Sequence, residues 1–314
     1  MNKVKTSAFP FLENVSLRGY MAQSLPLARY TRWRVGGEAD LAFFPIDVDD
    51  LQNFLSALPS EMPLTILGLG SNVLIRDKGI RGAVVFIHEM KDEPIFTADG
   101  IYAPAGLSTP KLARFAAQHH CIDAAFLVGI PGTVGGALAM NAGCHGDEIW
   151  RHVRRVEVMR RDGERISRLA DEYQVGYRHV HLLKENDSSL SEIFIGVWLA
   201  FQRDEKRPLA DNLADIKRLL ARRAESQPQT VPNAGSVFRN PPNDYAGRLI
   251  EEVGLKAYSI GGAQISEKHA NFIINPQAQA SAADIEVLIE YVQQQVYEKK
   301  GIQLIPEVRI IGEK

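Results

Sequence analysis

The stretch GIPGTVGGALAMNAG, Gly129–Gly143, contains four glycines and one proline within its first eight residues. A single turn does not need so many glycines, which are favoured where the backbone takes positive φ or approaches another group closely. Ala137, Ala139 and Ala142 keep the following residues small as well. This composition suits backbone wrapped against a flat or phosphorylated ligand. Tight packing between two backbone elements explains the segment equally well when it is taken alone.

A second glycine cluster, GLGSNVL at 68–74, directly follows the apolar strand pattern LTIL. Its glycines, adjacent N–H groups and serine hydroxyl are suited to a phosphate. The third glycine of a dinucleotide fingerprint is absent, since Val73 stands there, and the lysine of a P-loop is absent too. By itself this motif favours an ordinary tight turn after a strand. Upstream, TRWRVGGEAD at 31–40 places two arginines around a tryptophan before paired glycines, which by itself is compatible with a surface turn.

Length and composition limit the classes of protein to consider. The 314 residues and 34.9 kDa suit two or three packed units rather than one small module. At 45% hydrophobic and 24% charged, the chain can bury large cores, which excludes a disordered or fibrous protein. The formal net charge of −2 argues against a mainly electrostatic nucleic-acid binder. Cys121 and Cys144 form no CxxC pattern, which argues against a disulfide scaffold and favours a reducing cytoplasm.

The sequence also argues against a membrane span and a metal site. The longest stretch without a formally charged side chain, 124–146, is long enough to cross a bilayer. It carries six glycines, Pro131, Asn141 and His145, which a lipid-exposed helix would not tolerate. The amino terminus lacks the apolar stretch of a secretory signal, so we expect a soluble chain. The eight histidines show no ligand spacing such as HExxH, so we predict no metal site.

Short β-rich runs and amphipathic patterns predict a mixture of strands and helices. The predicted strands are 40–44, 64–67, 83–87, 95–98, 101–103, 153–160, 193–201, 270–274 and 302–311, and the predicted helices are 49–58, 109–119, 210–225, 244–253 and 283–299. This mixture predicts an α+β or α/β architecture up to about Gln202. The charged segment 202–208 predicts a domain boundary, followed by a compact α+β domain.

Taken together in this order, TRWRVGG, GLGSNVL and GIPGTVGGALAMNAG resemble the FAD-binding domain of the vanillyl-alcohol-oxidase type. The later motifs NAGSVFRNP, AGRLIEEVGLK, GGAQISEKHANFIIN and PEVRIIG resemble the UDP-N-acetylenolpyruvoylglucosamine reductase family, in its shorter form without a substrate-covering insertion. The resemblance runs from about Thr31 to Gly312 and implies an α+β fold. It implies an amino-terminal tail over 1–26 and an FAD-binding domain over 27–203, whose two subdomains divide near 95–105. A carboxyl-terminal α+β substrate-binding domain over 208–314 follows.

The resemblance implies a flavoenzyme of peptidoglycan synthesis in the bacterial cytoplasm. Hydride from NADPH would reach non-covalently bound FAD and then the terminal carbon of an enolpyruvyl ether on a UDP-sugar. We expect the protein to be a monomer and to bind neither nucleic acid nor a membrane. The expected cofactor residues are Arg34, Gly36, Gly37, Gly68, Gly70, Ser71, Asn72, Val73, Pro131, Gly132, Gly135, Gly136, Asn141, Ala142 and Gly143. The expected substrate residues are Tyr177, Arg239, Asn240, Lys268 and His269.

Three residues match the catalytic positions of the family. Ser236 is the expected proton donor, although a serine between Gly235 and Val237 is by itself most often a turn or strand residue. Arg178 is expected to face the substrate carboxylate and the developing enolate through its guanidinium fork, unless it is a surface arginine paired with an acid. Glu307 matches the catalytic carboxylate, and a protonated working form would let it donate a hydrogen bond to the enolate. Its alternative is a solvated charge pair with a neighbouring arginine.

Some features leave other interpretations open. The family commonly follows its Tyr-Arg pair with a small polar residue and then an aromatic one, whereas this chain has Val180 and Leu182. A second hypothesis is another flavin oxidase or dehydrogenase of the same fold, which could tether flavin through Cys144 or His145. A third is a non-catalytic nucleotide-sugar sensor, which the joint presence of the three catalytic residues disfavours.

Overall fold

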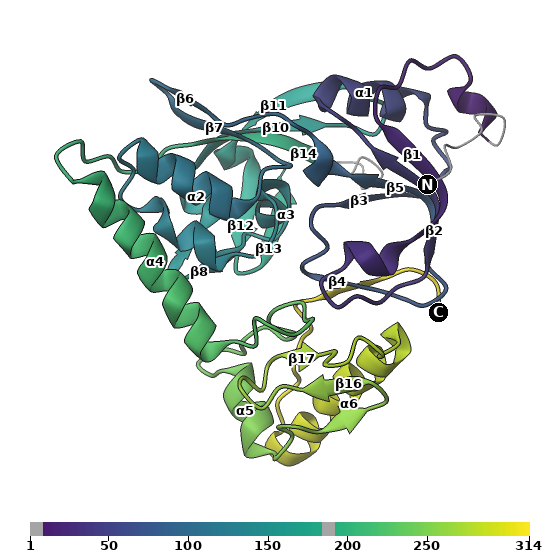
Figure 1. Ribbon diagram of the computed structural model, residues 1–314, viewed down its shortest axis with the longest axis vertical. Helices are drawn as coiled ribbons and strands as arrows, with labels where there is room; N and C mark the ends of the chain where they lie inside the picture. Colours follow the sequence, from purple (N-terminus) through teal and green to yellow (C-terminus); the bar gives the residue numbers. More distant parts are fainter. Residues whose placement is uncertain (1–8, 184–191) are drawn as a thin grey trace. The chain divides into compact units, whose positions relative to one another are not determined.

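A computed structural model describes residues 9–183 and 192–314. Residues 1–8 of the predicted tail lie outside this description. The helices are α1 (Val48–Ala57), α2 (Thr109–Gln118), α3 (Val134–Ala139), α4 (Leu209–Ser226), α5 (Ala246–Glu252) and α6 (Ala282–Lys300). The strands are β1 (Tyr20–Pro26), β2 (Glu38–Phe44), β3 (Leu64–Leu67), β4 (Val73–Ile75), β5 (Ile80–Phe86), β6 (Ile95–Thr97), β7 (Gly100–Pro104), β8 (Gly143–Cys144), β9 (Asp147–Glu148), β10 (Val153–Met159), β11 (Arg165–Leu169), β12 (Tyr173–Gly176), β13 (His179–Leu182), β14 (Ile193–Leu199), β15 (Ser259–Ile260), β16 (Ala263–Ile265), β17 (Ile273–Ile274) and β18 (Arg309–Ile311). The predicted α+β class is confirmed, and the elements are labelled in Figure 1.

The described residues form two compact units that are discontinuous along the chain. Unit 1 takes its described residues from Met1–Gln23, Ala42–Gly68 and Ala83–Ala221, and unit 2 consists of Ser24–Leu41, Leu69–Gly82 and Arg222–Lys314. The division therefore falls inside α4, whereas we place the functional boundary at 202–208. The reason is that Ile216 of α4 belongs to the core of unit 1, and Asn212 donates its side-chain N–H to the carbonyl of Ala117 at 3.4 Å. The functional domain limits stay a prediction.

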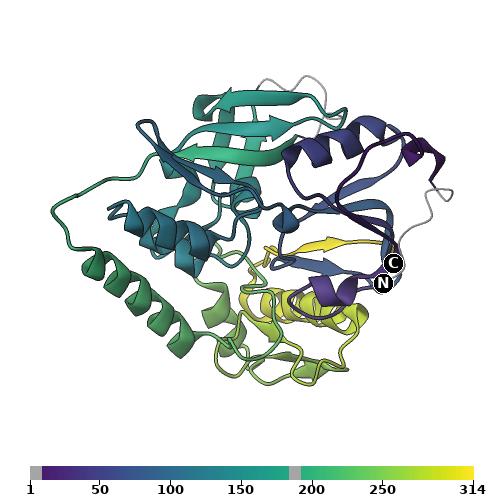
Figure 2. The same cartoon turned by 45° about the horizontal axis from the view of Figure 1, so that its top comes forward.

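Unit 1 is built on a five-stranded sheet in the order β11-β10-β14-β7-β6, with every neighbouring pair antiparallel. Figures 1 and 2 show α2 on one side of this sheet. Helix α2 begins with Pro110 in its first turn, as the sequence predicts, because proline supplies a helical φ and its missing N–H is not needed there. Elsewhere in this unit β3 pairs with β5 in parallel, which places Gly68 immediately after the carboxyl end of β3.

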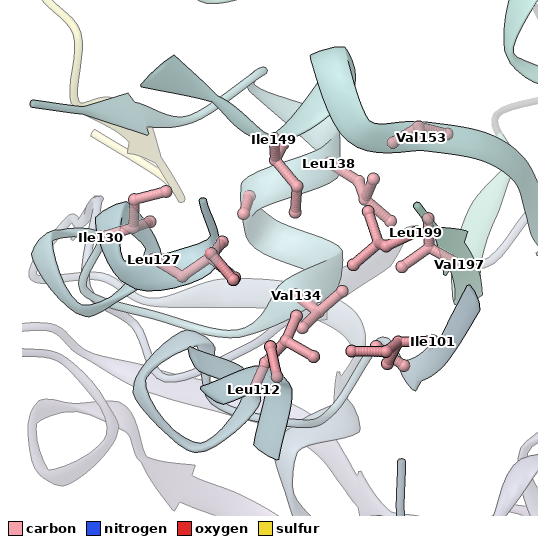
Figure 3. Packing of buried hydrophobic residues seen from close by; sticks show 14 of the residues in the cluster. Ile101, Leu112, Leu127, Ile130, Val134, Leu138, Ile149, Val153, Val197 and Leu199 are labelled. Carbon is pink, nitrogen blue, oxygen red and sulfur yellow. The ribbon is translucent and has the colours of Figure 1, made fainter. Parts of the chain in front are cut away.

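The core of unit 1 surrounds α3, a short helix inside the glycine-rich stretch that the sequence patterns do not predict. Figure 3 shows Val134 and Leu138 of this helix pointing toward apolar side chains from the sheet, among them Ile101 and Val197. All four side chains are buried. Its small residues allow this: an ideal Cβ on Gly135 would lie only 3.0 Å from the Cβ of Ala105. The second glycine cluster therefore lies against buried backbone, as the packing interpretation requires.

Unit 2 packs α6 and α5 on the small antiparallel sheet β15-β16-β17, and pairs β18 in parallel with β4. Helix α6 begins at the capping box of Ser281 and Asp284 and ends at Gly301, whose φ of 68° suits glycine. Asp77 accepts hydrogen bonds from the first two N–H groups of α6, both at 2.9 Å. Acidic oxygens are favoured at this end of a helix dipole.

Two predicted strands are shorter than the sequence suggests. Of the predicted strand 302–311 only β18 is regular, because Pro306 has no N–H to donate to a ladder. Of the predicted strand 270–274 only β17 remains. Here the side chain of Asn271 bonds both backbone groups of Phe238, accepting at 2.9 Å and donating at 2.8 Å, in place of a strand partner.

One ion pair of unit 2 predicts a pH-dependent stability. Arg76 donates two hydrogen bonds of 2.9 Å to Glu286 on α6, and this arginine holds the pKa of Glu286 below its usual value. The folded carboxyl has the lower pKa, so its contribution is complete above the unfolded pKa of about 4.3 and is lost as pH falls through the folded pKa. We expect Glu286→Gln to lower the free energy of unfolding by about 1–3 kcal/mol at pH 7.

Urea unfolding of the wild type and this variant at pH 7 and pH 3 measures the effect. The difference between the two proteins should shrink from pH 7 to pH 3, because the wild-type carboxyl takes up its proton as the pH falls through its lowered pKa. Glu225→Gln, which changes an exposed carboxylate on α4, is the control and should have little effect at either pH. A difference that persists unchanged at pH 3 would refute an ionic origin.

Candidate active site

In unit 1 the two predicted glycine clusters meet. An ideal Cβ on Gly68 would lie 2.5 Å from Oγ1 of Thr133, so only glycine allows this approach. Thr133 is the N-cap of α3, and its hydroxyl accepts the N–H of Gly136 at 3.2 Å. Gly135 is buried, whereas Pro131 and Gly136 are exposed. Gly68, directly after β3, therefore lies against Thr133 of the second cluster, and sequence reasoning missed this role of Thr133.

The end of the second cluster lies against the hairpin of β12 and β13. Arg178 is in the two-residue loop of this hairpin at a φ of 55°, and it donates to the carbonyl of Asn141 at 3.2 Å and to that of Gly143 at 3.3 Å. Its guanidinium carbon lies 4.9 Å from the centre of the exposed Tyr177 ring. The structure therefore brings the predicted catalytic arginine to two predicted cofactor residues, Asn141 and Gly143.

The two residues that depart from the family pattern have packing roles. Val180 pairs with Val175 across the hairpin and packs against the core of unit 1. Leu182 pairs with Tyr173 and is buried. Because both strands keep their pairing, the departures leave the hairpin intact and the backbone position of Arg178 defined.

In unit 2 the TRWRV segment alternates between buried and exposed side chains. Thr31, Trp33 and Val35 are buried, and Arg32 and Arg34 are exposed. The Trp33 indole N–H donates to the carbonyl of Ile273 at 2.7 Å, and Trp33 accepts from Asn275 at 3.0 Å. The anchored tryptophan thus holds both flanking guanidinium groups outward. Arg34 takes a φ of 60°, which is unusual for a residue with a side chain.

These arginines border a cavity of about 640 Å³ in unit 2. Its described lining includes Arg29, Arg32 and Arg34 and no carboxylate; Gln229–Pro232 close the other side. Pockets for nucleotides and similar ligands commonly have volumes of 300–1,000 Å³. Three guanidinium groups with no carboxylate among the described lining residues favour an anion such as a phosphate. Sequence reasoning selected Arg34 but missed Arg29 and Arg32, although the alternation around Trp33 could have indicated Arg32.

The first glycine cluster continues into unit 2 beside this cavity. Gly70 accepts a hydrogen bond from the N–H of Arg32 at 3.0 Å. Gly36 has a φ of 129°, and an ideal Cβ on Gly37 would lie 2.2 Å from the carbonyl oxygen of Asp77. The carbonyl of Gly70 therefore lies against the N–H of Arg32, and Gly37 lies against the turn at Asp77–Gly79. The role of these residues in cofactor binding stays a prediction.

Gly70 offers a direct test of this close approach. Its φ is 58°, and an ideal Cβ there would lie 2.0 Å from the carbonyl oxygen of Tyr30. Gly301 has a similar φ of 68° with nothing within 4 Å of its ideal Cβ. We expect Gly301→Ala to cost about 1–2 kcal/mol from backbone strain alone, and Gly70→Ala to cost clearly more, because the loop must move. Chemical unfolding of both variants measures the difference; equal losses would show that the contact is unimportant.

Ser236 and Glu307 lie on neighbouring backbone segments of unit 2. The N–H of Glu307 donates to the carbonyl of Val237, next to Ser236, at 2.7 Å. Asn72 ties the first glycine cluster to the same place: its side chain donates to the carbonyl of Glu307 at 3.1 Å, and its own carbonyl accepts from Arg309 at 3.0 Å. Both Ser236 and Glu307 are half-buried. The structure therefore brings together two of the three predicted catalytic residues and the predicted phosphate loop.

The predicted substrate residues of unit 2 are less closely grouped. Asn240 accepts the N–H of Ala246 at the start of α5, and Lys268 donates to the carbonyl of Ala224 near the end of α4, at 2.6 Å. Burial lowers the pKa of His269, whose Nδ1 accepts from the N–H of Asn271 at 3.2 Å. Arg239 has a buried Nε without a hydrogen-bond partner in the described part of the chain. Three of these side chains therefore have structural partners, and Arg239 retains a donor that a ligand could use.

The two candidate tethering residues are packed against Gly129 in unit 1. An ideal Cβ on this glycine would lie 2.5 Å from Sγ of Cys144 and 3.1 Å from Nε2 of His145. At the other cysteine, Cys121, burial raises the pKa of the thiol to about 11, so it is protonated at neutral pH and acts as a small packed residue.

The described residues offer neither a metal site nor a helix that could cross a membrane. Across 9–183 and 192–314, no three or more His, Cys, Asp or Glu side chains are grouped so that they could hold a metal ion. Within the same residues, none of the helices combines the length and the apolar character that a bilayer crossing requires.

Comparison with known proteins matches both parts of the chain. Residues 39–167 match the family described as FAD binding domain, and residues 227–311 match the family described as UDP-N-acetylenolpyruvoylglucosamine reductase, C-terminal domain. The UDP-N-acetylenolpyruvoylglucosamine reductase of Coxiella burnetii (strain Dugway 5J108-111) is 49% identical over 94% of this chain and 97% of that relative. That of Legionella pneumophila (strain Paris) is 49% identical over 94% of this chain and 95% of the relative.

A solved structure agrees with these matches. The crystal structure of UDP-N-acetylenolpyruvylglucosamine reductase (MurB) from Thermus caldophilus superposes with a TM-score of 0.75 at 31% identity, covering 94% of this chain and 99% of that one. The fold expected from the sequence motifs, an FAD-binding domain followed by the family's carboxyl-terminal domain, is confirmed. The chain belongs to the UDP-N-acetylenolpyruvoylglucosamine reductase family.

Proposed function

We propose that this protein is an FAD-containing, NADPH-dependent reductase that converts UDP-N-acetylglucosamine enolpyruvate to UDP-N-acetylmuramate in peptidoglycan synthesis. Membership of the family supports the reaction. The structural observation that carries the proposal is the backbone contact between the Ser236 and Glu307 segments, 2.7 Å from N–H to carbonyl, with Asn72 of the phosphate loop bonded to the same place. One hydrogen-bonded framework thus holds the segments of the proposed acid Glu307, the proposed proton donor Ser236 and the proposed cofactor loop.

The donor set of the protein fits FAD. Glycines at 36, 37 and 70 let backbone N–H groups lie close together, and Ser71 and Asn72 supply side-chain donors. The cationic cavity beside them, with Arg34 at its edge and no carboxylate in its described lining, suits a diphosphate. We propose that these residues and the glycine-rich segment 131–143 hold the cofactor. When bound, FAD supplies hydride transfer, which no protein side chain can provide.

The residues of the chain then have distinct tasks in the reduction. The enolpyruvyl C=C bond accepts a hydride at its terminal carbon and a proton at the carbon that bears the carboxylate, and NADPH is oxidised to NADP⁺. Negative charge develops at the second carbon and its carboxylate before the proton arrives. Arg178 is proposed to bind this carboxylate, Glu307 to donate a hydrogen bond to the enolate oxygen, and Ser236 to deliver the proton. A serine is acidic enough because a carbanion-like carbon is far more basic than water.

Several finer points belong to the same proposal. NADPH is the expected reductant, the UDP-sugar the expected partner, and a monomer in the cytoplasm the expected state. Tyr177 and Arg239 are proposed to contact the substrate directly. Asn240, Lys268 and His269 are also proposed as substrate residues, although their side chains have hydrogen-bond partners within the protein.

An anaerobic flavin titration tests the proposal. NADPH should bleach the flavin absorbance of the purified protein, and UDP-N-acetylglucosamine enolpyruvate should restore it in a one-to-one ratio. Bleaching without recovery would point to another substrate and overturn the proposed reaction. A protein that binds the sugar nucleotide but is never bleached would support a sensor instead. Release of the flavin by acid distinguishes a non-covalent cofactor from one tethered through Cys144 or His145.

A further inference from the structure

Asn141 holds both ends of the hairpin loop that carries Arg178. Its side-chain amide donates to the carbonyl of Gly176 at 3.1 Å, just before the loop, and its backbone carbonyl accepts from the Arg178 guanidinium at 3.2 Å. Asn141 is almost completely buried and takes a φ of 42°, while Arg178 takes a φ of 55°. Two residues in left-handed conformation therefore face each other through these bonds. Such strained backbone persists only where surrounding contacts determine it.

The Asn141 amide is itself fixed by Glu148. One N–H of the amide donates to Oε2 of Glu148, the other donates to Gly176, and the amide oxygen accepts the N–H of Trp150 at 3.4 Å. If the carboxylate were absent, the amide could turn and exchange its oxygen and nitrogen positions, which would place an acceptor against the carbonyl of Gly176. Glu148 therefore selects the orientation in which Asn141 binds the loop.

Glu148 also lies beside Gly143, whose carbonyl is the second acceptor for the Arg178 guanidinium. Strands β8 and β9 pair Gly143 with Glu148, and the carbonyl of Gly143 accepts from the guanidinium at 3.3 Å. Arg151 lies 3.6 Å from the other oxygen of Glu148, so this carboxylate has a cationic neighbour as well as the Asn141 amide. These two carbonyl acceptors of Arg178 thus belong to Asn141, whose amide Glu148 binds, and to Gly143, with which Glu148 pairs across the β8–β9 ladder.

We propose that Glu148, acting through Asn141, is a positioning residue for Arg178. The inference rests on the proposed function, because Arg178 is taken there to bind the substrate carboxylate. A guanidinium fork that moves by about 1 Å loses its bidentate alignment, and misplacements of that size cost up to about 100-fold in rate. Residues that orient a metal ligand from behind typically contribute about 10–100-fold, and we expect an effect of the same size for a residue that orients Arg178.

The test separates the two halves of the reaction by stopped-flow absorbance. Glu148→Ala should slow reoxidation of the flavin by the enolpyruvyl substrate by about 10–100-fold and leave its reduction by NADPH within about twofold of wild type. Glu148→Gln keeps an acceptor at the same reach and should recover most of the rate, whereas Glu148→Asp keeps the charge but loses the reach and should not. Glu164→Gln, which breaks an exposed ion pair with Arg160 in the same unit, is the control.

A double-mutant cycle with Arg178→Ala completes the test. If Glu148 acts through Arg178, adding Glu148→Ala to Arg178→Ala should lower the reoxidation rate by less than about threefold. If the two substitutions lower the reoxidation rate by independent factors that multiply, the inference is overturned. It is also overturned if Glu148→Asp retains a faster reoxidation rate than Glu148→Gln. Should Glu148→Ala fail to bind flavin, the Gln and Asp variants decide the question alone. A wild-type protein that the substrate does not reoxidise would instead refute the proposed function.

Discussion

Replacement of Ser236 by alanine should slow substrate-dependent reoxidation of the flavin by about 10²–10⁴-fold, the usual contribution of a general acid. The substitution removes only a hydroxyl, and the backbone there is held by Val237, which donates to Asn271 and accepts from Glu307. The fold and the NADPH-dependent bleaching should therefore be unchanged. Rapid mixing under anaerobic conditions measures both half-reactions on one sample.

Two further variants sharpen this result. Ser236→Cys restores a proton donor and should regain part of the lost rate. Ser259→Ala removes an exposed hydroxyl from the same unit and should behave as wild type. Reoxidation of Ser236→Ala at the wild-type rate would mean that the proton comes from solvent or from another side chain, and the assignment of Ser236 would be abandoned.

The second large effect is expected at Glu307. Alanine there should reduce the reoxidation rate by about 10²–10³-fold, the range found when one donor to a developing oxyanion is removed. Glutamine keeps an N–H donor in the same place, so Glu307→Gln should lose clearly less. Neither change should disturb the fold, because Glu307 is anchored by its backbone N–H and by the bond from Asn72 to its carbonyl.

Together, Glu307→Ala and Glu307→Gln show whether Glu307 acts as a hydrogen-bond donor or only through its negative charge. Equal losses for alanine and glutamine would contradict hydrogen-bond donation by a protonated acid. Glu313→Gln, at an exposed carboxylate six residues further along, serves as control and should leave both half-reactions unaltered.

Local sequence signals predict the parts of this fold that depend on local physics. Helices α2, α5 and α6 lie within a few residues of their predicted limits, because proline at a first turn, a capping box and apolar spacing act within one segment. The limits of β18 and β17 could not be predicted in this way. Pro306 and Asn271 redirect those segments toward Phe238, a partner more than 30 residues away in each case.

The candidate site shows the same division. Glycine patterns indicated the loops, and resemblance to the family indicated Ser236, Glu307 and Arg178. The cavity bordered by Arg29 and Arg32 could not be predicted, because Gln229–Pro232 reach it from 200 residues away in the sequence. The proposed role of Glu148 could not be predicted either, because it depends on a hairpin loop about 30 residues further on. Contacts between distant segments leave little periodicity or composition for a single sequence to reveal.

The interrupted course of the chain also has a consequence for biosynthesis. Ser24–Leu41 and Leu69–Gly82 leave the ribosome long before Arg222–Lys314, the portion that they must pack against. At about 5–20 residues per second, the early segments wait on the order of ten seconds or more, with Trp33 and Leu74 lacking their eventual neighbours. Strand β4 acquires β18 only when translation has reached the final residues. Nascent chains stalled shortly before residue 309 should therefore remain protease-sensitive in these early segments, and released chains should become resistant.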